Sequence, residues 1–286
     1  ENRVEECLIK SIDGESLTLH RFITEELSQH LNNYHVNGFK LIIGHSFSAS
    51  FALYSYLKGE GFYSAVIANS PLNKMEELVA ALNESAQLEN IFLSVGGSFQ
   101  SKDIHHRKEY ENLKEKNSDF FEGINTYEAN TAAHNGVPLL ANPVFLSELF
   151  YEYSIRLTKI AEVDMEYRLK KTPISIEDEL VSIQMASVIM GKNFPLEVSQ
   201  INGIASRYWA SDLTNYAIEI YRLGVDLYPY YYEFHAYLGE LLLESDKKQA
   251  LYHLRTSLEL LNEYESEMEY RDEIVKEIIE MIKNSQ

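Results

Sequence analysis

The first half of the chain alternates short β-rich segments with segments of helical period. The predicted strands cover residues 40–43, 64–68, 90–95 and 123–128. The predicted helices between them cover residues 46–58, 75–83 and 104–116. Because strands that alternate with helices are joined by crossover connections, this pattern predicts an α/β fold with a mostly parallel sheet. We place this domain at residues 1–150.

From about Pro143 onward the strand pattern disappears, and we predict only helices in residues 151–286. A small–large–small pattern occurs first at Ala217, Tyr221 and Gly224 and again at Ala250, Leu254 and Ser257. Small residues let paired helices approach closely, and Pro229 would end the second helix of a pair. The pattern resembles a tetratricopeptide repeat, so an all-α domain with tetratricopeptide-like repeats is expected. A generic helical hairpin is the alternative.

Residues 39–53 run from a predicted strand through Gly44-His45-Ser46 directly into a predicted helix. This context is typical of a nucleophile elbow, in which a sharp turn projects a serine from the sheet edge toward a helix N-terminus. Glycine two residues before the serine is expected because a side chain there would strike the turning backbone. Ser48 stands where the motif usually has a second glycine, so we interpret the stretch as a variant elbow. Ser46 is the candidate nucleophile.

A nucleophilic serine needs a base, and in α/β-type hydrolases the acid and the histidine follow the serine along the chain. His134 follows the fourth predicted strand, in the loop at 132–138, where such a base is expected. An ordinary loop histidine is the alternative interpretation of His134. The other downstream histidines are interpreted as solvent-facing (His105 and His106) or structural on the later helices (His235 and His253).

These stretches together carry a family resemblance. Residues 20–150 resemble the Putative esterase family of α/β-hydrolases, which includes enterobactin (ferric siderophore) esterases, esterase D and mycolyl transferases. The matching stretches are 22–27, 44–48, 68–71, 94–97 and 134–138. The resemblance implies an α/β-hydrolase fold with Ser46 as nucleophile and His134 as its base. It also extends to the tail, since some members carry a helical repeat domain after the hydrolase.

The acid that orients the histidine is where the chain departs from this family. The family places it just after the strand at 90–95, where this chain has Ser98 and Phe99; the nearest carboxylate is Asp103. Either Asp103 reaches His134 and completes a triad, or the site works as a Ser–His dyad. The position of Ser98 and Phe99 slightly favours the dyad, and Asp103 is the candidate acid of a triad.

The family also has several strands before the nucleophile strand, whereas only about 38 residues precede it here. Those strands would complete the sheet and carry the second N–H of the oxyanion hole, the first being the backbone N–H of Phe47. Residue 1 is Glu rather than Met, so we expect an N-terminally incomplete domain with any signal peptide upstream. The compartment, periplasmic or cytoplasmic, stays open.

Composition excludes several classes of function. The 44 acidic and 25 basic residues give a net charge of −19, which disfavours nucleic-acid binding. No apolar run reaches the roughly 18 residues of a membrane span. The single cysteine, Cys7, excludes an internal disulfide and a cysteine-based metal cluster. No cofactor or metal is predicted.

The sequence therefore predicts a serine esterase that hydrolyses a small-molecule carboxylic ester through an acyl-enzyme at Ser46, with His134 as general base. The alternative is a catalytically impaired hydrolase-like scaffold that binds a protein partner through its helical repeats. A metal site built from acidic loops is a third reading, but no His/Asp/Glu spacing in the chain supports it. The ester itself is not predicted, because the family spans siderophore lactones, small thioesters and lipid esters.

Overall fold

The structure is a computed structural model that describes residues 18–31, 33–34, 38–85, 88–97, 103–265 and 268–285. The chain divides into two compact units. Unit 1 comprises Glu1–Ser154 with Met190–Lys192, and unit 2 comprises Ile155–Ile189 with Asn193–Gln286. No helix among the described residues is both long and apolar enough to cross a membrane.

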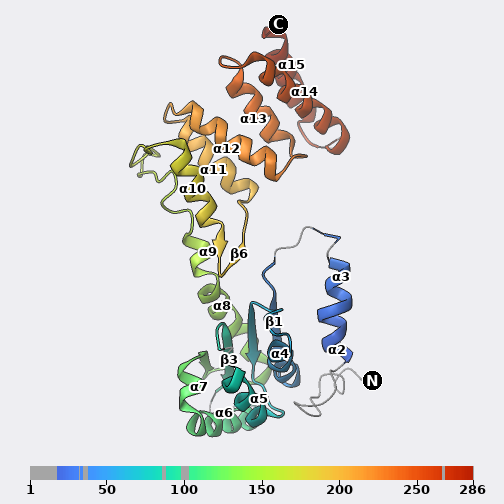
Figure 1. The fold of residues 1–286 in the computed structure, drawn as a ribbon, viewed down its shortest axis with the longest axis vertical. Helices are drawn as coiled ribbons and strands as arrows, with labels where there is room; N and C mark the ends of the chain where they lie inside the picture. The colour runs from blue at the N-terminus through green and yellow to red at the C-terminus, as the bar shows by residue number, and fades with distance from the viewer. Residues whose placement is uncertain are drawn as a thin grey trace. The chain divides into compact units, whose positions relative to one another are not determined.

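Unit 1 is built on a four-stranded parallel sheet (Figure 1). Its strands are β1 (Leu41–His45), β2 (Ala65–Asn69), β3 (Ile91–Gly96) and β4 (Asn125–Ala129), hydrogen-bonded in that order. All three pairings are parallel, which confirms the predicted mostly parallel sheet. Within the described residues β1 is an edge strand, and Ile43 on it is 46% exposed. Because all four strands are parallel, their carboxyl ends lie at the same end of the sheet.

Helices cover both faces of this sheet. The helices that pack on the sheet are α4 (Phe47–Lys58), α5 (Met75–Ser85), α6 (Ile104–Lys116), α7 (Ser118–Glu122) and α8 (Val137–Leu149). Because side chains alternate along a strand, Val66 and Ala68 of β2 join one core with α4 to α7. Ala65 and Ile67 join a second core with α8 on the opposite face. The sheet is thus buried between two apolar layers, as expected for parallel strands.

A helical segment before the sheet packs against the first of these cores. It consists of α2 (Thr18–Arg21), η1 (Phe22–Leu27) and α3 (Ser28–Leu31). Leu19 and Ile23 pack against the core that includes α4. The buried His20 places its Nδ1 2.9 Å from the hydroxyl of Ser55 on α4. The segment therefore helps to hold the helix that follows Ser46.

Unit 2 is mainly helical. Its larger helices are α10 (Ile176–Ala186), α11 (Val198–Trp209), α12 (Thr214–Leu227), α13 (Tyr232–Leu242), α14 (Lys247–Tyr264) and α15 (Arg271–Asn284). The small residues lie where helices approach closely: a Cβ on Gly224 would be 3.0 Å from Ile201 Cγ2 and 3.0 Å from the Phe234 ring. A Cβ on Gly239 would lie 2.7 Å from Leu254 Cγ. The close approach inferred from the sequence is present, and the assignment to the tetratricopeptide class remains a prediction.

The prediction of helices alone after Pro143 is wrong at one place. A short hairpin is formed by β5 (Val188–Ile189) and β6 (Lys192–Asn193). Its two turn residues have positive φ, 49° at Met190 and 66° at Gly191, as in the type I′ turn that suits two-residue hairpins. Strands of two residues are too short to show an alternating pattern, which explains why the sequence did not reveal them. A short helix, α9 (Tyr151–Ile155), also follows α8.

Candidate active site

The predicted site residues lie beyond the carboxyl ends of the parallel strands. Ser46 directly follows β1, and Gly96 ends β3. His134 comes shortly after β4 and opens a short 3-10 turn, η2 (His134–Gly136). In open α/β sheets this end of the strands is where ligands bind.

Ser46 has the backbone of a nucleophile elbow. Its φ is 62° and its ψ is −127°, a conformation that residues with a side chain rarely adopt. Its N–H donates a 2.9 Å hydrogen bond to the Asn69 carbonyl at the end of β2. A Cβ at Gly44 would lie 2.1 Å from the Ser48 carbonyl oxygen, so glycine is required at position 44 for the reason inferred from the sequence. Ser48 itself is exposed, so a side chain there meets no obstacle.

Phe47 is the first residue of α4. The first N–H groups of a helix have no partner inside the helix, and the helix dipole makes this end favourable for negative charge. The Phe47 N–H, next to the Ser46 side chain, is thus suited to stabilise an oxyanion.

Asp103 and His134 are in direct contact. His134 Nδ1 lies 2.6 Å from Asp103 Oδ1, and the Asp103 side chain is fully buried. Asp103 occupies the N-cap position of α6, but its side chain does not cap the helix. This contact does not support the slight preference for a dyad. Ser98 and Phe99, on which that preference rested, lie outside the described residues.

The other carboxylate oxygen of Asp103 is held by two donors. The Ser70 hydroxyl donates to Oδ2 at 2.8 Å and the Gly96 N–H donates to it at 2.5 Å. A Cβ on Gly96 would lie 2.5 Å from Oδ2, so glycine permits this approach. Burial raises the pKa of Asp103, but contacts with His106, Ser70, His134 and the Gly96 N–H outweigh it and lower the pKa to about 2. Asp103 is therefore a carboxylate at neutral pH.

Two further histidines surround His134. Its ring centroid lies 4.2 Å from that of His106, at 25°, and 4.3 Å from that of His45, at 34°. His45 Nε2 lies 3.0 Å from the His134 carbonyl oxygen and is the donor in that hydrogen bond. Burial and the neighbouring His134 lower the pKa of His45. Neither His45 nor His106 is among the site residues predicted from the sequence.

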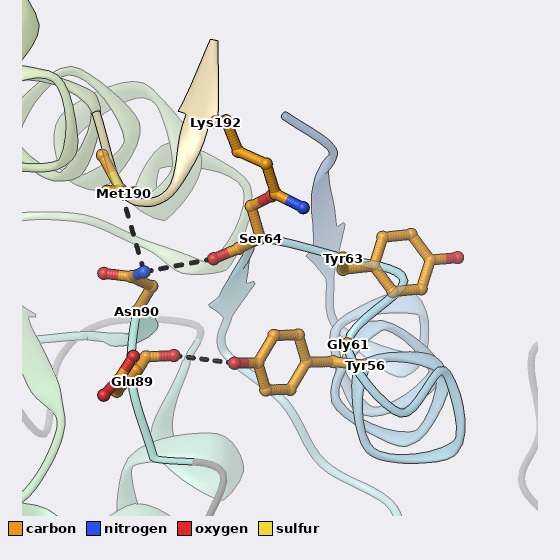
Figure 2. Close-up of a pocket in the computed structure, with 8 residues that line it drawn as sticks. All are labelled: Tyr56, Gly61, Tyr63, Ser64, Glu89, Asn90, Met190 and Lys192. Atoms are coloured by element: carbon orange, nitrogen blue, oxygen red, sulfur yellow. Dashed lines mark hydrogen bonds between the residues drawn. The ribbon is translucent and has the colours of Figure 1, made fainter. Parts of the chain in front are cut away.

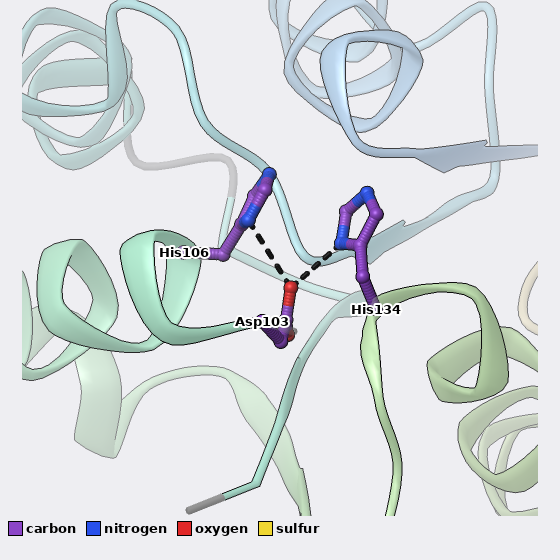
Figure 3. Close-up of side chains that lie close together, drawn as sticks. All are labelled: Asp103, His106 and His134. Carbon is purple, nitrogen blue, oxygen red and sulfur yellow. Dashed lines mark hydrogen bonds and ion pairs between the residues drawn. The ribbon is translucent and has the colours of Figure 1, made fainter. Parts of the chain in front are cut away.

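The prediction that His106 faces solvent is wrong. Its side chain is only 13% exposed, and Figure 3 shows its ring directed at Asp103, with Nδ1 3.1 Å from Oδ1. His105 is exposed, as predicted. The reason is helical period: His106, Tyr110 and Leu113 recur at intervals of three to four residues and turn the same face of α6 inward. That spacing was visible in the sequence.

The same residues form a group that could hold a metal ion. Asp103, His106 and His134 each offer one ligand atom, and these atoms lie within 4.8 Å of one another. The sequence spacing did not indicate this group because the fold assembles it from α6 and the loop after β4.

A cavity of about 590 Å³ in unit 1 lies at the other end of the sheet (Figure 2). It is lined by Tyr56, Gly61, Tyr63, Ser64, Glu89, Asn90, Met190 and Lys192. Ser64 and Asn90 immediately precede β2 and β3, so the cavity is at the amino ends of the strands. Asn90 Nδ2 donates to the Ser64 carbonyl at 3.2 Å. This cavity is separate from the Ser46 site, and we assign it no part in the chemistry.

Comparison with known proteins finds one family model and two solved structures that are similar to this chain. Residues 10–127 match the model of the family described as "Putative esterase". The fold is similar to that of an IroE-like serine hydrolase from Shewanella oneidensis, with a TM-score of 0.52, 13% identity, and coverage of 78% of this chain and 75% of that one. It is also similar to an uncharacterised protein from Capnocytophaga ochracea DSM 7271, with a TM-score of 0.51, 13% identity, and coverage of 98% and 81%. No curated protein matches the chain.

Proposed function

We propose that the protein is a serine hydrolase that cleaves a small-molecule carboxylic ester through an acyl-enzyme at Ser46. The observation that carries this proposal is the pairing of an elbow serine with a histidine held by a buried carboxylate at the same end of the sheet. The match of residues 10–127 to an esterase family and the similarity of the fold to a serine hydrolase support it.

In this proposal His134 is the general base. Its Nδ1–H donates to Asp103 Oδ1, so Nε2 is the nitrogen left to accept the proton of the Ser46 hydroxyl. The Ser46 oxygen then bonds to the ester carbonyl carbon, and the Phe47 N–H stabilises the negative oxygen that forms. His134 returns the proton to the departing alkoxide, and an alcohol leaves. Water, activated in the same way, then releases the acid and restores Ser46.

Asp103 has the role of orienting acid. Its carboxylate is positioned by the Ser70 hydroxyl and the Gly96 N–H, and it fixes the tautomer and direction of the His134 ring. It also stabilises the imidazolium that forms when His134 takes the proton. We therefore favour a triad over a dyad.

The test is covalent labelling with a fluorophosphonate, which reacts with activated serines. We expect intact-mass analysis to show one adduct on the full chain and peptide mapping to place it on Ser46. Ser46→Ala should abolish the adduct, whereas Ser48→Ala, which removes an exposed serine in the first turn of α4, should keep it. Labelling that persists in Ser46→Ala would refute the assignment.

The same experiment distinguishes the proposed serine hydrolase from the alternative function inferred from the sequence. A catalytically impaired scaffold that binds a protein through tetratricopeptide-like helices predicts a folded protein with no adduct at Ser46. In an active enzyme, the helices of unit 2 would position a partner or the substrate and would take no part in bond breaking.

A further inference from the structure

We propose that Asp103, His106 and His134 form a Zn²⁺-binding site, and that zinc bound there switches the hydrolase off. The inhibitory consequence rests on the proposed function, whereas the binding site rests on the three side chains alone. Two imidazoles and one carboxylate are ligands that zinc commonly takes.

The ligand atoms already converge on one point. Nδ1 of His134 and Nδ1 of His106 lie 2.6 Å and 3.1 Å from the same oxygen, Asp103 Oδ1 (Figure 3). Zinc bonds of about 2.0–2.2 Å in tetrahedral geometry separate neighbouring ligand atoms by about 3.3–3.6 Å. The two distances from the histidines to Asp103 Oδ1 would therefore lengthen by less than about 1 Å to admit the ion. A fourth position would remain for water.

His106 is one of several side chains whose buried polar atoms lack a hydrogen-bond partner among the described residues. Its Nδ1 and Nε2 are both buried, and neither has a hydrogen-bond partner within the described part of the chain. The 3.1 Å approach to Asp103 is an ion-pair distance without the alignment of a hydrogen bond. A buried polar atom without a partner is costly. A metal ion on Nδ1 would supply the missing partner.

The surroundings of Asp103 suit a metal ligand. Because Ser70 and Gly96 hold Oδ2, Oδ1 is left directed at the two histidines. Such hydrogen bonds to a ligating carboxylate typically support metal affinity. The net charge of −19 also raises the local concentration of cations. The site thus has a first ligand held in place before any ion arrives.

Zinc on this site would remove the base. A neutral histidine that ligates through Nδ1 carries its proton on Nε2, so the proton of His134 would move from Nδ1 to Nε2. With Nε2 protonated, His134 cannot accept the Ser46 proton. Asp103 would be drawn to the ion and would no longer orient the ring. Ester turnover should therefore fall as zinc binds and return when a chelator removes it.

The binding test is calorimetric titration of the full chain with ZnCl₂ in a non-chelating buffer. We expect His106→Phe, which keeps an aromatic ring beside His134 but removes a direct ligand, to bind zinc more than about 100-fold more weakly. Losing a residue that only hydrogen-bonds to a ligand typically costs about 10- to 100-fold. His105→Phe, the exposed neighbour on α6, should bind zinc as the unaltered chain does. Equal affinity in the His106 and His105 variants would overturn the site.

Inhibition is measured separately, with each variant compared with its own metal-free rate. Zinc should suppress ester turnover of the unaltered chain and of His105→Phe, and EDTA should restore it, whereas His106→Phe should resist. Binding with undiminished turnover would overturn the inhibitory role. Calorimetry needs no turnover, so the metal site is decided by it even if Ser46 proves unreactive.

Discussion

The hydroxyl of Ser70 donates a 2.8 Å hydrogen bond to Asp103 Oδ2, while His134 contacts the other oxygen, Oδ1, at 2.6 Å. Ser70 directly follows β2, whereas Asp103 directly precedes α6. The carboxylate is therefore held in place by a residue at the end of a sheet strand. This anchoring explains how an acid seven residues beyond Gly96 reaches the histidine.

Replacing Asp103 by Asn tests that arrangement. The amide keeps the shape of the carboxylate but favours the wrong tautomer of His134, so we expect ester turnover to fall by about 10⁴ with the fold retained. Hydrolysis of p-nitrophenyl esters measures the turnover, and the circular dichroism spectrum shows whether the fold is retained. A loss smaller than about tenfold would show that a dyad operates and that Asp103 is not the orienting acid.

His134→Ala removes the proposed base. We expect fluorophosphonate labelling and p-nitrophenyl ester turnover to fall together by about 10³ or more, because both need the Ser46 oxygen activated. His105→Ala is the matched control, since that histidine is exposed, and it should leave both rates unchanged. Normal turnover in His134→Ala would mean that another base is used.

In unit 2, Gly224→Leu should destabilise the helices. Any Cβ at this position already stands 3.0 Å from Ile201 and Phe234, and overpacking of this kind costs about 1–3 kcal/mol. Gly203→Leu on α11 is the control, because a Cβ there meets nothing within 4 Å. Trp209, the single tryptophan, lies on α11, so its fluorescence can follow thermal unfolding of this unit. An unchanged melting temperature in Gly224→Leu would show that the helices separate without cost.

A histidine pair in unit 2 makes its stability pH-dependent. His235 Nε2 donates to the Pro229 carbonyl at 3.2 Å. In a neutral His235 the Nδ1 then accepts a 3.1 Å hydrogen bond from His253 Nδ1. Burial and the neighbouring His235 lower the pKa of His253 from 6.5 to about 4. The unfolded chain therefore binds more protons between those values, and the free energy of unfolding should decrease as pH falls from about 6.5 to about 4.

Fluorescence-monitored melting of Trp209 across this range measures the effect. His253→Phe should flatten the pH dependence, since it removes the group that must be protonated. Carboxylates elsewhere in the chain also titrate near the lower end of this pH range. The quantity to compare is therefore the difference in melting temperature between the unaltered chain and His253→Phe at each pH. Parallel curves for the two proteins would contradict the assignment.

The sequence predicted the sheet well because β2 and β3 are fully buried and mostly apolar, and the partly exposed β1 and β4 continue the same alternation of strands and helices. Each of the four expected strands is present with ends shifted by a residue or two, and the helix expected at 104–116 is α6. Gly44 and Ser46 were identifiable because the elbow is a local structure whose requirements lie within five residues. The local sequence pattern was thus sufficient to predict those features that depend on short-range backbone geometry.

The surroundings of His134 were predicted less well because they depend on tertiary contacts. Ser70 and His45 follow or end strands that are neighbours only in the folded sheet, and neither carries a motif of its own. His106 was misplaced because a histidine pair at the start of a charged helix suggested solvent, whereas the helical period turned one member inward. The contact between Asp103 and His134 was likewise left open by the sequence, because the separation of two residues along the chain does not fix their distance in the fold.

The positive φ that gives Ser46 its place in the elbow also lowers the stability of the folded protein. A side chain held at 62° costs of order 1–3 kcal/mol relative to relaxed backbone, and a glycine would be spared most of that cost. Ser46→Gly should therefore melt at a higher temperature than Ser46→Ala, although both lack the nucleophile. The penalty belongs to the reactive position itself, so a catalyst built on this elbow is less stable than the inert protein one substitution away.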